Sequence, residues 1–307
     1  MTDVKRIACN HGFARCFILK IARFSHYENR LADGTLHALG RGLSLDPKAN
    51  YPWANAVLML LYPYEPLPAG AALSGYYLAS NAAYHAGQDV IADFTAAGVR
   101  AERCYLPVRE CAMMFGLGTP LKNGLTCWDE FGTRAAVQTL TAALPEPVEY
   151  ESERAPRATS MYCENCHACE RACPTGAIDA GGFDCFTCLR GRIDGETVEP
   201  EIMEKMPLIL GCELCQYACP VNAKIPSLDV PLPEFDLREL LTGNVKPALA
   251  LVGRNENKGG RLIAHAAVIA ANRRQYDLLP LIEALREDAR PLVKSCADWA
   301  AAKLKNV

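Results

Sequence analysis

Nine cysteines between residues 163 and 219 have the spacing of iron–sulfur ligands. The first motif reads C-x2-C-x2-C-x3-C-P, and the second reads C-x2-C-x3-C-P. The first spacing is that of bacterial two-cluster ferredoxins, in which three thiolates hold one 4Fe-4S cluster and the cysteine before proline ligates the other cluster. The motifs therefore predict two 4Fe-4S clusters that exchange one ligand each.

Two clusters with four cysteine ligands each need eight thiolates, and the two motifs supply seven. The segment FDCFTCLR offers Cys185 or Cys188 as the eighth. We assign Cys188 to the second cluster and give Cys185 no role. The assigned ligands of the first cluster are Cys163, Cys166, Cys169 and Cys219. The assigned ligands of the second cluster are Cys173, Cys188, Cys212 and Cys215.

Structural zinc and disulfides are the alternatives for such a set of cysteines. Structural zinc sites usually have separated C-x2-C pairs, without a third cysteine and without the C-P ending. Disulfides need an oxidising compartment, and the first residues, MTDVKRIACNHGF, contain no apolar signal-peptide core. His167 lies inside the first motif, but a ring between two loop ligands more often faces solvent, so we do not count it as a ligand.

Composition indicates an ordinary globular protein of two or three domains. The chain has 307 residues, of which 50% are hydrophobic and 22% are charged, with a net charge of −3. The other six of its 15 cysteines are scattered, as is usual in a reducing compartment. No apolar run approaches the roughly 20 residues of a membrane span. We therefore expect a cytoplasmic protein with no membrane partner.

Three segments are expected to position this chemistry, and together they predict a multidomain fold of the α+β/α/β class. Residues 1–150 form an α/β domain that binds cofactor or substrate, because buried apolar runs alternate there with helical periodicity. Residues 155–228 form the two-cluster ferredoxin-like module. Residues 229–307 form a helical tail that resembles an antiparallel helix pair or a fragment of a HEAT-type repeat.

Individual elements follow from the apolar pattern. We expect strands over residues 14–22, 56–64 and 101–107, and a strand after a DEFG turn within 125–144. We expect helices over residues 75–98, 109–118, 260–272, 276–288 and 289–304. The helix over 109–118 runs into a glycine turn.

Standard nucleotide and hydrolase motifs are absent from the sequence: it has no Walker loop, GxGxxG, HExxH or GxSxG. Two clusters without a nicotinamide or flavin signature indicate that electrons arrive from another molecule. They must then leave to something that the first 150 residues bind.

The cysteine layout, with its isolated ligand between two motifs, resembles that of epoxyqueuosine reductases, the cobalamin-dependent iron–sulfur enzymes of queuosine modification in tRNA. It is more distantly similar to corrinoid reductive dehalogenases. In the reductase family the isolated ligand follows an Asp by four residues, and Asp184 followed by Cys188 fits that spacing. The segments GCELCQYACPVN and LPVRECAMMFGLGTPLKNGL also resemble family segments, and the likeness covers nearly the whole chain.

The resemblance implies cobalamin as a further cofactor, tRNA as a partner, and flavodoxin or ferredoxin as the low-potential electron donor. It also implies a catalytic acid, and counting back from the glycine turn puts Glu102 at that position; burial would raise its pKa. The cofactor-binding residues that it implies are Arg109, Gly116, Gly118, Lys122 and Asn123.

Several positions depart from the family pattern. Leu121 stands in place of a glycine, Val221 in place of a tryptophan, and Glu102 in place of an aspartate. Two alternatives therefore stay open. One is a corrinoid and iron–sulfur reductase that acts on another small molecule. The other is a non-enzymatic, ferredoxin-type electron-transfer protein.

Overall fold

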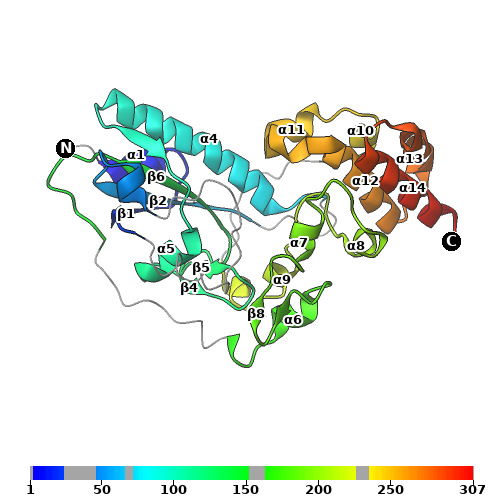
Figure 1. Cartoon of the computed structure of the whole chain (residues 1–307), viewed down its shortest axis with the longest axis horizontal. Helices are drawn as coiled ribbons and strands as arrows, with labels where there is room; N and C mark the ends of the chain where they lie inside the picture. The colour runs from blue at the N-terminus through cyan, green and yellow to red at the C-terminus, as the bar shows by residue number, and fades with distance from the viewer. Residues whose placement is uncertain (1–2, 24–45, 66–71, 152–162, 226–234, 307) are drawn as a thin grey trace. The chain divides into compact units, whose positions relative to one another are not determined.

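The computed structural model describes residues 3–23, 46–65, 72–151, 163–225 and 235–306 (Figure 1). The chain divides into two compact units. The first unit comprises Met1–Tyr64 and Ala82–Asn165, and the second comprises Glu65–Asn81 and Cys166–Val307. The cluster motifs from Cys166 onward thus share a unit with the C-terminal helices. Within the described ranges, no helix has both the length and the apolar character needed to cross a membrane.

The first unit contains a four-stranded sheet in the order β1-β2-β6-β3. Its strands are β1 (Arg15–Lys20), β2 (Ala56–Pro63), β3 (Ala101–Arg103) and β6 (Ala135–Ala142). Every neighbouring pair is antiparallel, with Ile18 opposite Leu58 and Leu58 opposite Leu140. The mixed content of helices and strands confirms the expected class, while the antiparallel pairing makes this part α+β.

Strand β2 is the centre of the first unit's core. Its first six residues are all buried, because the strand has neighbours on both edges and its two faces are covered. Met59 belongs to a cluster with Cys111 and Phe115, so the segment that contains α5 (Val108–Met114) covers one face of the sheet. Helix α4 (Gly75–Ala96) approaches β6, where the backbone of Gly87 lies against the side chain of Gln138.

Shorter elements complete the first unit. Helix α1 (Val4–Asn10) begins at Asp3, whose carboxylate accepts a hydrogen bond from the N–H of Arg6 at 3.0 Å, as an N-cap does. Asp46 caps α3 (Pro47–Asn50) in the same way. A two-stranded ribbon, β4 (Thr119–Pro120) with β5 (Thr126–Cys127), follows the glycine turn after α5.

The cysteine motifs lie on short elements. They are α6 (Ala168–Ala172), β7 (Ile178–Asp179), β8 (Gly182–Phe183), α7 (Leu189–Arg192), α8 (Pro200–Lys205), α9 (Leu214–Tyr217) and a 3-10 turn, η2 (Asn222–Lys224). β7 and β8 pair as a small hairpin. Helices this short have little stability of their own, so this region depends on its ligands and neighbours for its shape.

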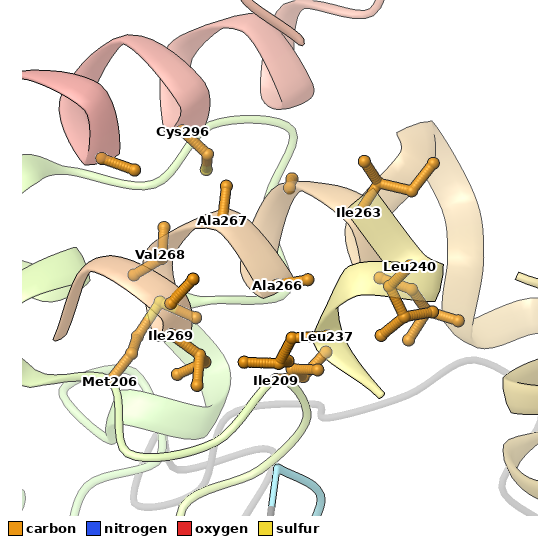
Figure 2. Packing of buried hydrophobic residues seen from close by; sticks show 14 of the residues in the cluster. Met206, Ile209, Leu237, Leu240, Ile263, Ala266, Ala267, Val268, Ile269 and Cys296 are labelled. Carbon is orange, nitrogen blue, oxygen red and sulfur yellow. The ribbon is translucent and has the colours of Figure 1, made fainter. Parts of the chain in front are cut away.

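The C-terminal part of the chain is helical. Its elements are α10 (Leu237–Leu241), α11 (Lys246–Val252), η3 (Arg254–Gly260), α12 (Arg261–Asn272), η4 (Tyr276–Leu278), α13 (Leu279–Ala284), η5 (Leu285–Glu287) and α14 (Pro291–Lys305). Helix α12 is the hub, since it contacts α8, α10 and α14. Figure 2 shows Cys296 of α14 on one side of α12 and Ile209 on the other. The alanines of α12 allow this close packing on several sides.

Most expected elements are confirmed. The helix over 75–98 is α4, and the C-terminal helices over 260–272 and 289–304 are α12 and α14. The strand over 101–107 is shorter than expected and ends at Arg103. The expected helix over 276–288 is broken into η4, α13 and η5. Residues 152–162 and 226–234, before and after the cysteine motifs, lie outside the described residues.

Candidate metal centre

The two cysteine motifs share one local structure. Residues 166–174 and 212–220 both read C-x2-C-x3-C-P. In each loop the residue after the first cysteine is left-handed, with φ of 48° at His167 and 57° at Glu213. A single-turn helix follows, α6 or α9, and these two helices pack together. The repeat therefore gives both loops the same backbone conformation at their first two cysteines.

Four of the expected ligands, Cys173, Cys188, Cys212 and Cys215, lie within electrostatic reach of one another. Burial raises the pKa of Cys215 to about 12, and charge on neighbouring thiols, including all three others and Cys169, adds to the rise. Burial likewise raises the pKa of Cys212 to about 11, with contributions from Cys188 and Cys173. These mutual effects show that the four thiols lie near one another, as the ligands of one 4Fe-4S cluster must.

Cys173 differs from these neighbours. Burial alone would raise its pKa, but hydrogen bonds from Thr175 and from backbone N–H groups outweigh burial and lower the pKa. The N–H of Ala177 donates to the sulfur at 3.2 Å. Hydrogen bonds to ligand sulfurs also tune the reduction potential of an iron–sulfur cluster.

The surroundings of Cys185 and Cys188 differ too. The pKa of Cys188 is raised by burial, and Cys173 is among the charges that act on it. The pKa of Cys185 is raised by burial and then by Asp184, its direct neighbour. Asp184 shapes the turn between the two cysteines, since its carboxylate accepts hydrogen bonds from the N–H of Phe186 and from the hydroxyl of Thr187.

The expected ligand set of the first cluster is divided by the unit boundary. Cys163 falls in the first unit, and Cys166, Cys169 and Cys219 fall in the second. The geometry of this set therefore stays a prediction. Among the described residues, no three His, Cys, Asp or Glu side chains are grouped to hold a single metal ion. A 4Fe-4S cluster makes a different demand, because each thiolate binds a different iron atom.

Glu102 is not in the environment that the sequence suggested. It lies on β3, an edge strand of three residues, and its side chain keeps 46% of its accessible surface. Its carboxylate pairs with the guanidinium of Arg100 at 2.7 Å. A buried acid is therefore not found at this position, because Glu102 alternates with the buried Ala101 on β3 and lies on the solvent side of the strand.

The other expected cofactor residues gather at the turn after α5. Arg109 donates to the carbonyl of Gly124 at 3.4 Å, and Gly116 has a φ of 61°, which favours glycine. A Cβ at Gly118 would lie 2.5 Å from the methyl group of Thr126, so internal packing alone requires glycine there. The local structure of the turn therefore accounts for the residue types of Arg109, Gly116 and Gly118.

Lys122 and Asn123 complete the turn. Lys122 is partly buried, and Asn123 keeps 3% of its surface. The Oδ1 of Asn123 accepts a hydrogen bond from the N–H of Leu125 at 3.3 Å. Its Nδ2 is buried and has no hydrogen-bond partner among the described residues. Asn123 therefore has an unused donor at the turn.

Sequence reasoning missed Glu213. It is the counterpart of His167 in the second loop, yet its side chain is buried and bonded to the first turn of α4. The repeat itself held the signal, since a charged residue and a histidine occupy one position of two matching loops.

The model of the 4Fe-4S double cluster binding domain matches residues 162–222. This match covers both cysteine motifs and the isolated Cys188, so iron–sulfur clusters are supported independently of the spacing argument.

Curated relatives extend the likeness beyond that domain. The chain is 29% identical over 212 residues to an epoxyqueuosine reductase of Lactococcus garvieae, covering 62% of this chain and 56% of the relative. It is 27% identical over 204 residues to an epoxyqueuosine reductase of Bacillus anthracis, covering 62% and 52%. The chain thus spans about half the length of the curated relatives it matches.

A solved structure of epoxyqueuosine reductase with a tRNA-Tyr epoxyqueuosine-modified tRNA stem loop shares the fold, with a TM-score of 0.77 and 21% identity. The match covers 98% of this chain and 89% of that one. Together the comparisons confirm that the chain resembles the epoxyqueuosine reductases and carries a double-cluster iron–sulfur domain.

Proposed function

We propose that this chain is an iron–sulfur oxidoreductase that reduces epoxyqueuosine to queuosine in tRNA, with cobalamin as its second kind of cofactor. The observation that carries the proposal is the coincidence of two features. A double-cluster domain contains a set of thiols within electrostatic reach of one another. The same chain resembles epoxyqueuosine reductases over about 200 residues that extend well beyond that domain.

The two clusters are assigned as the spacing predicts. The mutual influence of Cys173, Cys188, Cys212 and Cys215 on one another's pKa supports their assignment to the second cluster. It also favours Cys188 over Cys185, whose main neighbouring charge is Asp184. Cys163, Cys166, Cys169 and Cys219 are assigned to the first cluster on spacing alone.

Cobalamin would be held by the turn after α5. The buried, unpartnered Nδ2 of Asn123 fits a polar ligand group, because buried donors are rarely left without an acceptor. Arg109 and Lys122 would supply positive charge at the same turn, and Gly116 and Gly118 give it its shape. When bound, cobalamin supplies a metal centre that receives low-potential electrons and passes them to the substrate.

Glu102 is the proposed proton donor. The oxygen of an epoxide that is finally lost as water needs a proton, because hydroxide is a poor leaving group near neutral pH. The carboxyl group of Glu102 is accessible to a substrate, because the side chain keeps 46% of its surface. Its role in this proposal is to hold a proton for that oxygen.

The remaining partners follow from the same proposal. The electron donor would be a flavodoxin or ferredoxin, since the sequence has no nicotinamide or flavin motif. The C-terminal helices, from α10 to α14, would act as a HEAT-like tail near tRNA, and the protein would work in the cytoplasm. The proposal also keeps the division of the chain into three segments, residues 1–150, 155–228 and 229–307.

One observation favours a second candidate, a corrinoid and iron–sulfur reductase acting on another small molecule. Leu121 stands where the resemblance expects glycine, and its side chain keeps only 2% of its surface. A buried leucine at the cofactor turn changes the space available to a ligand there.

Anaerobic purification with added cobalamin tests both candidates. About eight irons and one cobalt per chain, with conversion of epoxyqueuosine in a tRNA stem loop, are expected for the first. The same metal content without conversion of that tRNA would favour the second. A full complement of iron without bound cobalamin would contradict both and leave an electron-transfer protein.

A further inference from the structure

Glu213 binds the first turn of helix α4 through both carboxylate oxygens. Its Oε1 accepts hydrogen bonds from the hydroxyl of Ser74 at 2.8 Å and from the N–H of Tyr76 at 3.0 Å. Its Oε2 accepts one from the N–H of Gly75 at 3.3 Å. Only 8% of the Glu213 surface is exposed. A carboxylate this buried needs such donors, because a buried charge without partners is strongly unfavourable.

The position of these donors explains why an acidic residue is stable there. Gly75 and Tyr76 belong to the first turn of a 22-residue helix, where backbone N–H groups have no partner within the helix. The helix dipole also puts partial positive charge at this end, and a carboxylate is favoured beside it. Glu213 therefore acts as an N-terminal cap supplied from a segment that is distant in sequence.

Two further contacts hold the second cysteine loop to the same segment. The N–H of Ile209 donates to the carbonyl of Ala72 at 2.7 Å. Gly211 has a φ of 79°, and a Cβ on it would lie 2.9 Å from the Cβ of Ser74. The backbone just before Cys212 is thus packed directly against the start of α4.

Glu213 lies between two expected ligands of the second cluster, directly after Cys212 and two residues before Cys215. His167, at the matching position of the first loop, is 49% exposed and pairs with Glu170 of its own loop at 2.9 Å. The net charge around a cluster and the hydrogen bonds near its sulfurs set its reduction potential. The matching position of the two loops therefore holds a buried carboxylate, Glu213, in one loop and a histidine paired with a carboxylate, His167 with Glu170, in the other, and this makes the surroundings of the two clusters electrostatically different.

We propose that Glu213 is a positioning residue for the second cluster: it fastens the Cys212–Cys215 loop to the first turn of α4 and lowers that cluster's reduction potential relative to the first. The inference rests on the proposed cluster assignment, and iron content reports on that assignment separately from the potentials. It does not depend on the substrate.

The test compares three variants of the full chain with the wild type, each reconstituted anaerobically. Iron is counted, and both midpoint potentials are measured by redox titration monitored by electron paramagnetic resonance. Glu213→Gln keeps the shape and removes the charge, so one midpoint should move to a more positive potential. Ser74→Ala keeps the charge and removes one donor, so the same midpoint should move to a more negative potential. His167→Asn is the matched control in the first loop and should leave that same midpoint unchanged.

We expect the midpoint potential of one cluster to shift in opposite directions in Glu213→Gln and Ser74→Ala. A general loosening of the loop would shift this potential in the same direction in both variants. Full iron content with unchanged potentials in Glu213→Gln would overturn the proposal, as would equal shifts of both clusters. If Glu213→Gln loses about four irons while His167→Asn keeps about eight, the fastening role is supported. In that case the midpoint potential of Ser74→Ala tests the electrostatic role. A shift to a more negative potential supports that role, and no shift or a shift to a more positive potential rejects it.

Discussion

The two C-x2-C-x3-C-P loops have the same spacing and the same left-handed residue, but different surroundings. In the first loop the polar contacts of His167 and Arg171 are local, to Glu170 and to the carbonyl of Cys166. In the second loop Glu213 reaches 139 residues back along the chain to Ser74. The comparison teaches that spacing specifies where thiols go, while distant segments decide how each cluster differs from the other.

The C-terminal helices add to the support of the second loop. The ring of His265 on α12 bonds the carbonyl of Ile209 at 2.7 Å, and Asn272 donates to the carbonyls of Met203 and Met206. Lys303 of α14 in turn donates to the Oδ1 of Asn272 at 2.8 Å. The approach to Cys212 is therefore fixed by side chains of two C-terminal helices.

The largest expected effect comes from removing a thiol. Cys169 on α6 and Cys215 on α9 occupy equal positions of the two loops, so Cys169→Ala and Cys215→Ala should each lower the iron content from about eight to about four per chain. The remaining paramagnetic signal should differ between the two variants, because each loses a different cluster.

Cys185→Ala is the control for this pair, since Cys185 has no assigned ligand role. Iron and sulfide assays should give the wild-type content for it. Loss of iron in Cys185→Ala together with full content in Cys188→Ala would reverse the assignment of the eighth ligand.

The second expected effect is a loss of folding stability at acidic pH. Burial lowers the pKa of His265 to about 4, from about 6.5 in the unfolded chain. Between these values the unfolded chain binds more protons, so stability is complete above about pH 6.5 and falls as the pH drops toward 4. The full shift corresponds to about 3 kcal/mol of unfolding free energy.

The check is the thermal unfolding midpoint at pH 7.5 and at pH 5.5. His265→Gln should be less stable at the higher pH but should lose less stability between the two. An equal drop in the wild type and in His265→Gln would exclude His265 as its source.

The glycine turn of the first unit gives a third, smaller effect. A methyl group at Gly118 would overlap the side chain of Thr126, so Gly118→Ala should lower the unfolding free energy by about 1–3 kcal/mol. At Gly87, inside α4, the nearest atom is the Cγ of Gln138 at 3.7 Å, an ordinary contact. Gly87→Ala should therefore raise stability by up to about 1 kcal/mol. Chemical denaturation measures both, and equal effects of the two variants would contradict this account.

Much of the fold was readable from local pattern. The buried run of β2, the helix α4 and the alanine-rich α12 each have enough residues for a periodic signal to stand out. The pairing of β1, β2, β6 and β3 was not readable, because register depends on residues far apart in sequence. The cysteine spacing predicted the double-cluster domain, but the contacts of Glu213 depend on a helix start that no local pattern connects to it.

Glu102 shows the same limit, and it gives the smallest expected effect on stability. The predicted strand was longer than the three residues of β3, and Glu102, next to the buried Ala101, lies on the solvent side of that strand, paired with Arg100. An exposed pair of this kind contributes about 0.2–1 kcal/mol, so Glu102→Gln should change the unfolding free energy by no more than about 1 kcal/mol.

If Glu102 is the proton donor, the same variant should lower turnover by about 10²–10⁴-fold. Glu130→Gln is the matched control, because Glu130 forms a similarly exposed pair with Arg15 in the same unit. Equal turnover in the two variants, measured on an epoxyqueuosine-containing stem loop at saturating electron donor, would remove Glu102 from the reaction and leave its pairing with Arg100 as a surface contact.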